Sequence, residues 1–157
     1  MGLLSLSPRP VPVDHGPMSL DQSAMGTDST RLAVLDDAEC LRLLASVPLG
    51  RIAVSDRALP SVLPVYFLLL GRTVLLRVSG AGRLAAATRA AVVAFEADEM
   101  GPTGGWSVLG IGRTRAVRPD ERAAASGLRR WGVGEHDRFV AVRLEMLTGR
   151  RLPPPTG

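Results

Sequence analysis

Short apolar runs separated by glycine and proline turns follow one another along most of this chain. They are rich in β-branched residues and closely spaced, a pattern typical of antiparallel strands. Six strands are predicted, at residues 50–55, 61–70, 73–79, 91–98, 105–117 and 138–144. Gly71 and Arg72 form a tight hairpin connection between the second and third of them. The pattern predicts a mainly β fold, a six-stranded antiparallel barrel with flanking helices.

Few segments carry helical signals. Asp36 followed by Glu39 is the pattern of a capping box, and it predicts a helix that ends before Pro48. The residues expected on its buried face are Leu41, Leu44 and Ala45, with Cys40 beside them. Two further helices are expected, at residues 82–88 and 120–127.

The two ends of the chain differ in composition from its middle. Residues 1–30 hold four prolines, many small polar residues and no aromatic residue, which predicts a disordered tail. Residues 31–152 form one expected domain, and the proline-rich residues 153–157 form a mobile tail. The longest apolar run, 62–70, is too short to cross a membrane. Without a signal-peptide pattern either, the expected location is the cytoplasm.

Composition excludes several chemistries. All 19 basic residues are arginine, so a Schiff-base lysine and a Walker-type lysine are both ruled out. Cys40 is the only cysteine, and we expect it in the core rather than in a metal cluster or a disulfide. With only His15 and His136 as histidines, no metal site is expected.

The charge pattern argues against a nucleic-acid partner. The net charge is only +4, and the arginines alternate with Asp and Glu instead of forming a basic run. The six aromatic residues belong to no recognisable nucleic-acid-binding module. We therefore expect neither nucleic acid nor a membrane as a partner.

One turn carries a specific chemical signal. The strand at 73–79 leads through Ser79, Gly80, Ala81, Gly82 and Arg83 into an alanine-rich segment. A glycine turn at a helix N-terminus offers backbone N–H groups to an anion such as a phosphate, and Arg83 adds a positive charge. The alternative interpretation is an ordinary turn with a solvated arginine.

Several segments, taken in order, point to a known family. They are Leu-Pro-Ser-Val-Leu-Pro-Val-Tyr-Phe at 59–67, the glycine turn, Gly-Gly-Trp-Ser-Val-Leu at 104–109 and Trp-Gly-Val-Gly-Glu-His-Asp at 131–137. Over roughly residues 35–152 the chain resembles the pyridoxamine 5′-phosphate oxidase-like family of split-barrel flavin-binding proteins. The resemblance implies a homodimeric flavoprotein oxidoreductase with FMN at the dimer interface and an unspecified small-molecule substrate.

The resemblance also implies a set of site residues. For the phosphate region they are Arg77, Val78, Ser79, Gly82 and Arg83. For the flavin ring they are Leu63, Pro64, Val65 and Tyr66, with Trp106 and Ser107 nearby. Trp131 and Arg138 belong to the segment that approaches the other subunit's site. No catalytic side chain is assigned.

Three positions depart from the pattern of the family. Val78 and Gly82 lack hydroxyl groups that many relatives have, and Tyr66 stands where relatives often have Asn. Alternatives therefore stay open: a deazaflavin, a haem with His136 as the candidate axial ligand, or a non-catalytic dimer without cofactor.

Dimer formation has a second argument beside the resemblance. We expect Trp106, Phe139 and nearby aliphatic residues to lie on an exposed face of the barrel. Such a face would be an unusually large apolar patch on a monomer, so a homodimer is expected.

Overall fold

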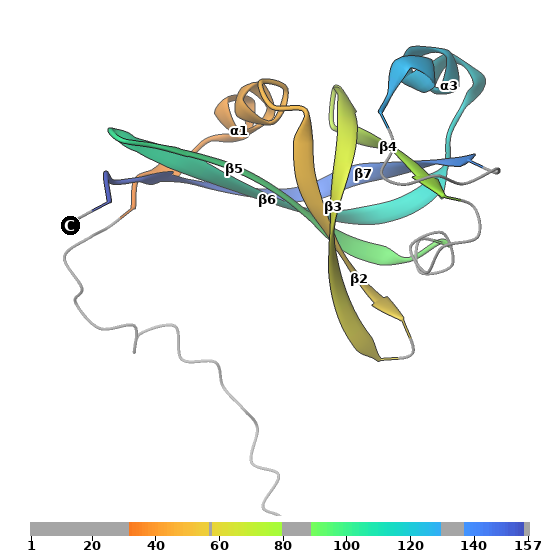
Figure 1. Ribbon diagram of the computed structural model, residues 1–157, viewed down its shortest axis with the longest axis horizontal. Coiled ribbons are helices and arrows are strands. Elements are labelled where there is room, and N and C mark those ends of the chain that lie inside the picture. Colours follow the sequence, from red (N-terminus) through yellow and green to blue (C-terminus); the bar gives the residue numbers. More distant parts are fainter. Residues whose placement is uncertain (1–31, 57, 80–88, 130–136, 156–157) are drawn as a thin grey trace, which may run out of the picture. The chain divides into compact units, whose positions relative to one another are not determined.

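The computed structural model of the chain describes residues 32–56, 58–79, 89–129 and 137–155 (Figure 1). The expected N-terminal tail, the expected helix at 82–88 and the last two residues of the C-terminal tail lie outside them. No helix in the described ranges is long and apolar enough to cross a membrane.

Six antiparallel strands close into a ring. They are β2 (Leu49–Asp56), β3 (Leu59–Leu70), β4 (Thr73–Ser79), β5 (Val92–Gly101), β6 (Gly104–Ala116) and β7 (Asp137–Leu152). The order is β7-β4-β3-β2-β5-β6, and a ladder between β6 and β7 joins the two ends. A two-residue strand, β1 (Val34–Leu35), adds to β7 outside the ring. The predicted mainly β fold with its six-stranded antiparallel barrel is confirmed.

The last strand is longer than expected. We predicted residues 138–144, whereas β7 has 16 residues and continues to Leu152. It pairs with β4 through Asp137–Arg143 and with β6 from Val140 to Leu152. Its second half carries Thr148 and Gly149, residues that resemble a turn, yet Gly149 is needed there because a Cβ would lie 2.5 Å from the Cys40 sulfur.

The helices follow the capping signals. Asp36 caps α1 (Asp37–Leu44), because its carboxylate accepts a hydrogen bond from the Glu39 N–H at 2.8 Å. The predicted face was wrong in part: Cys40, Leu43 and Leu44 are buried, whereas Ala45 is exposed and Leu41 is half-buried. The i, i+3, i+4 spacing of the buried three places them on one stripe against the barrel. The expected helix at 120–127 is present as α3 (Pro119–Ala124) followed by η2 (Ala125–Gly127).

The main core fills the barrel, and a smaller one lies outside it. Phe95, Ile52 and Val108 are fully buried inside. On the outer face of β4 and β7, α3 and η2 cover a second cluster built on Leu75, Ala125 and Ala141. Figure 1 shows α3 at the end of the barrel where β4 and β7 run.

The exposed face that we expected around Trp106 and Phe139 is absent. Trp106 is only 4% exposed and belongs to the main core, because its position on β6 faces the barrel interior. Phe139 is half-buried beside the second cluster, close to the Arg77 and Arg122 guanidinium groups. The argument for a dimer from these two residues was therefore wrong.

A different apolar surface crosses the outside of the barrel. Five outward positions are in register across five neighbouring strands: Val62, Ala53, Ala94, Ile111 and Met146. The two end members of this apolar row are the most exposed, Val62 at 62% and Met146 at 61%. The adjacent row has a charged centre, where Arg51 is 3.1 Å from the Glu96 carboxylate and 2.5 Å from that of Asp98.

Gly112→Ala should destabilise the fold. The β6–β7 register shifts between Ile111 and Gly112, and a Cβ on Gly112 would lie 1.9 Å from the Arg143 carbonyl oxygen. Because that oxygen belongs to the partner strand's backbone, the two strands must separate, at a cost of about 1–3 kcal/mol. Urea unfolding measures the loss. Gly127→Ala is the matched control, since no atom lies within 4 Å of its Cβ; an equal loss in both variants would contradict this account.

Candidate functional site

The sheet opens between β3 and β4. Their ladder runs only from Leu70↔Thr73 to Phe67↔Leu76. Beyond it, residues 59–66 of β3 pair with β2, and residues 77–79 of β4 pair with β7. The two strands therefore part at Tyr66 and Arg77, and each presents an edge to the other across the opening.

Two prolines stand on the parted half of β3. Pro60 and Pro64 lack the backbone N–H that a central strand needs on both sides. In β3 they oppose Ser55 and Arg51 of β2, in the part of the strand that has no β4 partner. Proline is tolerated where a strand has a single neighbour, so these residues agree with the opening.

The predicted ring residues alternate between the two faces of β3. Val65 is 4% exposed and belongs to the main core, and Leu63 packs against that core. Pro64 is exposed and Tyr66 is half-buried, both on the outer face. Only Pro64 and Tyr66 thus present side chains outside the barrel at the opening, whereas the side chains of Leu63 and Val65 face the core.

Tyr66 and Arg77 are brought together by one short segment. Arg77 Nη1 donates to the Leu128 carbonyl oxygen at 3.0 Å. The neighbouring Arg129 places its guanidinium carbon 5.2 Å from the centre of the Tyr66 ring, within the range of a cation–π contact. Residues 125–129, which we call the η2 wall, therefore contact both sides of the opening.

A groove lies between the η2 wall and β3. Its volume is about 220 Å³. Tyr66, Leu68 and Pro48 line it from the barrel side, and Leu128 and Arg129 from the wall. The lining is mostly apolar with one guanidinium group, an arrangement suited to part of a planar ligand.

Trp106 and Ser107 occupy a different part of the barrel. Ser107 Oγ donates to Glu96 Oε1 at 3.3 Å and so joins the ion pairs of Arg51. Trp106 lines a second cavity, of about 430 Å³, with Arg151 and residues of the β5–β6 hairpin. In the strand order, β5 and β2 separate these two residues of β6 from β3.

Several predicted site residues are only partly described. Gly82, Arg83 and Trp131 lie outside the described residues. Ser79 is the last residue of β4, and only its backbone is described. Val78 is buried, and Arg138, its partner across the β4–β7 ladder, is exposed.

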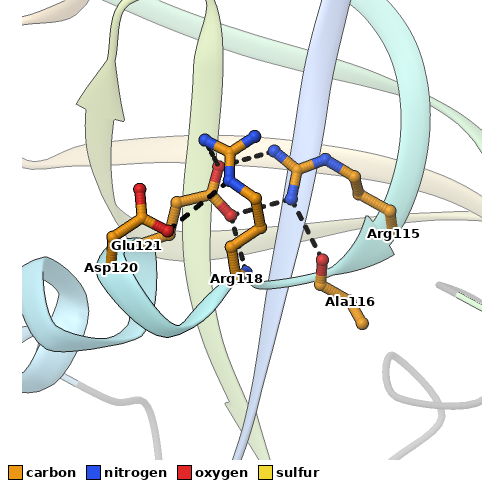
Figure 2. A network of polar contacts seen from close by, with 5 residues as sticks. All are labelled: Arg115, Ala116, Arg118, Asp120 and Glu121. Carbon is orange, nitrogen blue, oxygen red and sulfur yellow. Dashed lines mark hydrogen bonds and ion pairs between the residues drawn. The ribbon is translucent and has the colours of Figure 1, made fainter.

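A buried ionic cluster that we did not predict holds α3 (Figure 2). Glu121 is 2% exposed, and its carboxylate accepts hydrogen bonds from both Arg115 terminal nitrogens, at 2.7 and 2.6 Å. The Arg118 backbone N–H donates at 2.9 Å, and the Arg118 guanidinium lies 3.0 Å away. The hydrogen bonds from Arg115, with the further contacts of Arg118, lower the pKa of Glu121 to about 2.

The sequence around this cluster carries the pattern of a helix start. Pro119 at the first helical position and Glu121 two residues later are typical of a helix start. A glutamate there predicts a capping contact, and Glu121 makes it. Its burial depends on Arg115, which is six residues away on β6 and which no local pattern connects to it.

The family comparison covers the whole site. A family model described as pyridoxamine 5′-phosphate oxidase matches residues 36–151, which include β3, β4 and the η2 wall. The chain belongs to the pyridoxamine 5′-phosphate oxidase family. An uncharacterised protein of Mycobacterium tuberculosis is 35% identical over 127 residues, covering 75% of this chain and 84% of the relative.

Solved structures of similar proteins agree with this family. An FAD-binding protein from Mycobacterium smegmatis is 33% identical, with a TM-score of 0.69, over 78% of this chain and 100% of that one. A Corynebacterium glutamicum protein is 28% identical, also with a TM-score of 0.69, over 80% of this chain and 96% of that one. The barrel with its opening between β3 and β4 is thus similar to solved structures, one of which is that of an FAD-binding protein.

Glu121→Gln should flatten the acid dependence of stability. The folded pKa of about 2 lies below the ordinary value of 4.5, so ionised Glu121 stabilises the fold above about pH 4.5, and this contribution is lost as the pH falls towards 2. Urea unfolding at pH 7 and pH 3 should show the wild type losing on the order of 2 kcal/mol more than the variant. Glu145→Gln, which removes an exposed carboxylate, should keep the wild-type slope; equal slopes in all three proteins would contradict the role of Glu121.

Proposed function

We propose that this protein binds a flavin nucleotide at the opening between β3 and β4 and acts as a homodimeric oxidoreductase. The observation that carries the proposal is the parting of the two strands at Tyr66 and Arg77. These are the residues to which the family resemblance assigns the flavin ring and phosphate. The FAD-binding neighbour, at 33% identity and full coverage of its chain, supports a flavin as ligand.

FMN is the flavin that we propose first. Its ring would lie along the backbone edge of Leu63, Pro64, Val65 and Tyr66, where β3 has only β2 as a neighbour. Its phosphate would lie at the end of β4, near Arg77, Val78 and Ser79, and the turn with Gly82 and Arg83 follows directly in the sequence. Backbone N–H groups and arginine forks are strong ligands for a phosphate dianion.

Two further site residues complete the proposal. Trp131 and Arg138 would come from the other subunit, whereas Trp106 and Ser107 lie across β5 and β2 from β3 and would not reach the ring site of their own subunit. A bound flavin would supply the redox chemistry, and the protein would hold and orient it. This division of roles needs no side chain as general acid or base, which suits a chain that has no lysine and only two histidines.

FAD is the second candidate, and one observation favours it. The 33%-identical M. smegmatis protein is an FAD-binding protein. FAD also carries a phosphate next to its ribityl chain, so the same turn could hold either nucleotide. A deazaflavin, a haem or an empty site remain outcomes of the test.

The absorbance spectrum of the natively purified protein tests the proposal. A bound flavin gives a band near 450 nm, and mass spectrometry of the released ligand separates FMN, FAD and a deazaflavin. A colourless protein that takes up none of these on addition would overturn the proposal.

Arg83→Ala should weaken FMN binding by roughly 10- to 150-fold, the worth of one charged hydrogen bond of about 1.5–3 kcal/mol. Riboflavin, which has no phosphate, should bind the variant and the wild type equally. Thermal unfolding should barely change, since the sequence predicts a helix start at Arg83, and an arginine at such a position adds little to stability. Fluorescence titration with both flavins measures the effect. An equal loss for the two ligands would show that Arg83 does not contact the phosphate.

The apolar row supports the proposed homodimer. Its members (Val62, Ala53, Ala94, Ile111 and Met146) lie on every strand of the ring except β4, next to the Arg51 ion pairs. An apolar strip with a polar rim is the usual composition of a protein interface. Because the row begins on β3, a second copy seated on it would lie close to the proposed ring site.

Met146→Glu should shift the protein from dimer to monomer. The change places a charge on the exposed end of the apolar row and should raise the dimer dissociation constant by roughly 10-fold or more. Sedimentation at micromolar concentration measures it. Met100→Glu is the matched control, because Met100 is also about half-exposed, at 52%, but lies six residues along β5 from Ala94. A wild type that is a stable monomer would overturn the dimer.

A further inference from the structure

The Glu121 cluster is more elaborate than a six-residue helix requires. Two guanidinium groups and one backbone N–H contact a carboxylate that is almost fully buried. Arg115 belongs to β6, whereas Glu121 and Arg118 belong to α3 and its start. The cluster therefore fixes α3 to the barrel at one point, and a buried carboxylate is stable there only while its cationic partners stay in place.

The fixed helix leads directly to the proposed flavin site. Ala125, the first residue of η2, is fully buried against the second cluster. The Leu128 N–H donates to the Ala125 carbonyl oxygen at 3.0 Å, which turns the chain back towards the sheet. The Leu128 carbonyl oxygen then accepts the hydrogen bond from Arg77. Four residues of main chain thus connect the helix that Glu121 anchors with a side chain at the opening.

We propose that Glu121 is a positioning residue that orients Arg77 for phosphate binding by holding the Leu128 carbonyl oxygen in place. The proposal rests on the proposed flavin function. Glu121 itself touches no part of the proposed site, and its effect passes through the η2 wall. Loss of its charge leaves two guanidinium groups facing an amide, so α3 moves away from β6 and the acceptor that orients Arg77 moves with it.

A mere structural anchor predicts something different. If Glu121 only stabilised the fold, its loss would lower the melting temperature and affect all ligands alike. A positioning role acts mainly on the phosphate, since Arg77 is assigned to that group, and has a smaller effect on the ring through Arg129 and Tyr66. A positioning role also predicts that the effects of the Glu121 and Arg77 substitutions on FMN binding depend on each other.

The experiment is a double-mutant cycle on flavin binding. Glu121→Gln should weaken FMN binding about 10-fold and riboflavin binding much less, at a temperature where circular dichroism shows all variants folded. Arg77→Gln should give a similar loss, and the double variant should add little to either. Arg115→Lys keeps the charge but loses the two-pronged contact, so its loss should be smaller. Glu145→Gln, which removes an exposed carboxylate outside the cluster, should match the wild type.

The proposal would be overturned if the losses of FMN-binding free energy caused by the Glu121 and Arg77 variants were additive, or if FMN and riboflavin lost equal affinity.

A measurement without flavin separates the positioning role of Glu121 from the proposed flavin function. Tyr66 is the only tyrosine, so 3-fluorotyrosine gives a single ¹⁹F resonance beside Arg129 of the η2 wall. Glu121→Gln should shift or broaden that resonance, and Glu145→Gln should leave it unchanged. If the wild type binds no flavin, the proposed function fails, whereas an unchanged ¹⁹F resonance removes the coupling itself.

Discussion

The ladder between β6 and β7 is the interaction on which the other features depend. It runs along nearly all of β6 and joins the two ends of the sheet, so the barrel is closed on that side. Because β6 and β7 pair, the strands enclose the main core. β3 and β4 can therefore separate beyond their short ladder without unfolding the sheet. The close approach of Gly112 and Arg143 backbone at the register shift makes this ladder intolerant of a side chain. The opening, the η2 wall and the apolar row all take their positions from a ring that is held shut at β6–β7.

Local pattern predicted most of the fold. The strands, the Asp36 cap and the buried Cys40 follow from periodicity and turn chemistry, which act over a few residues. The second half of β7 was missed because Thr148 and Gly149 resemble a turn, and only the contact of Gly149 with Cys40 explains the glycine. Trp106 was assigned to the surface and lies in the core, since it shares the inward face of β6 with Val108.

The contacts that the sequence did not predict all join different elements. Arg77 contacts Leu128, which is 51 residues away, and Glu121 meets Arg115 of a different element. Such pairs depend on how the barrel brings its outer elements together, and no short motif encodes them. The family resemblance supplied the residues of the opening, but it did not identify the wall that lies over them.

The two prolines of β3 have a consequence for aggregation. An open strand edge invites pairing with strands of other molecules, and natural proteins protect such edges in several ways. At Pro60 and Pro64 the backbone has no N–H to donate, so an incoming strand cannot form a regular ladder along this part of β3. The opening can therefore admit a ligand without offering β3 as a template for a further β-strand, whether or not the ligand is present.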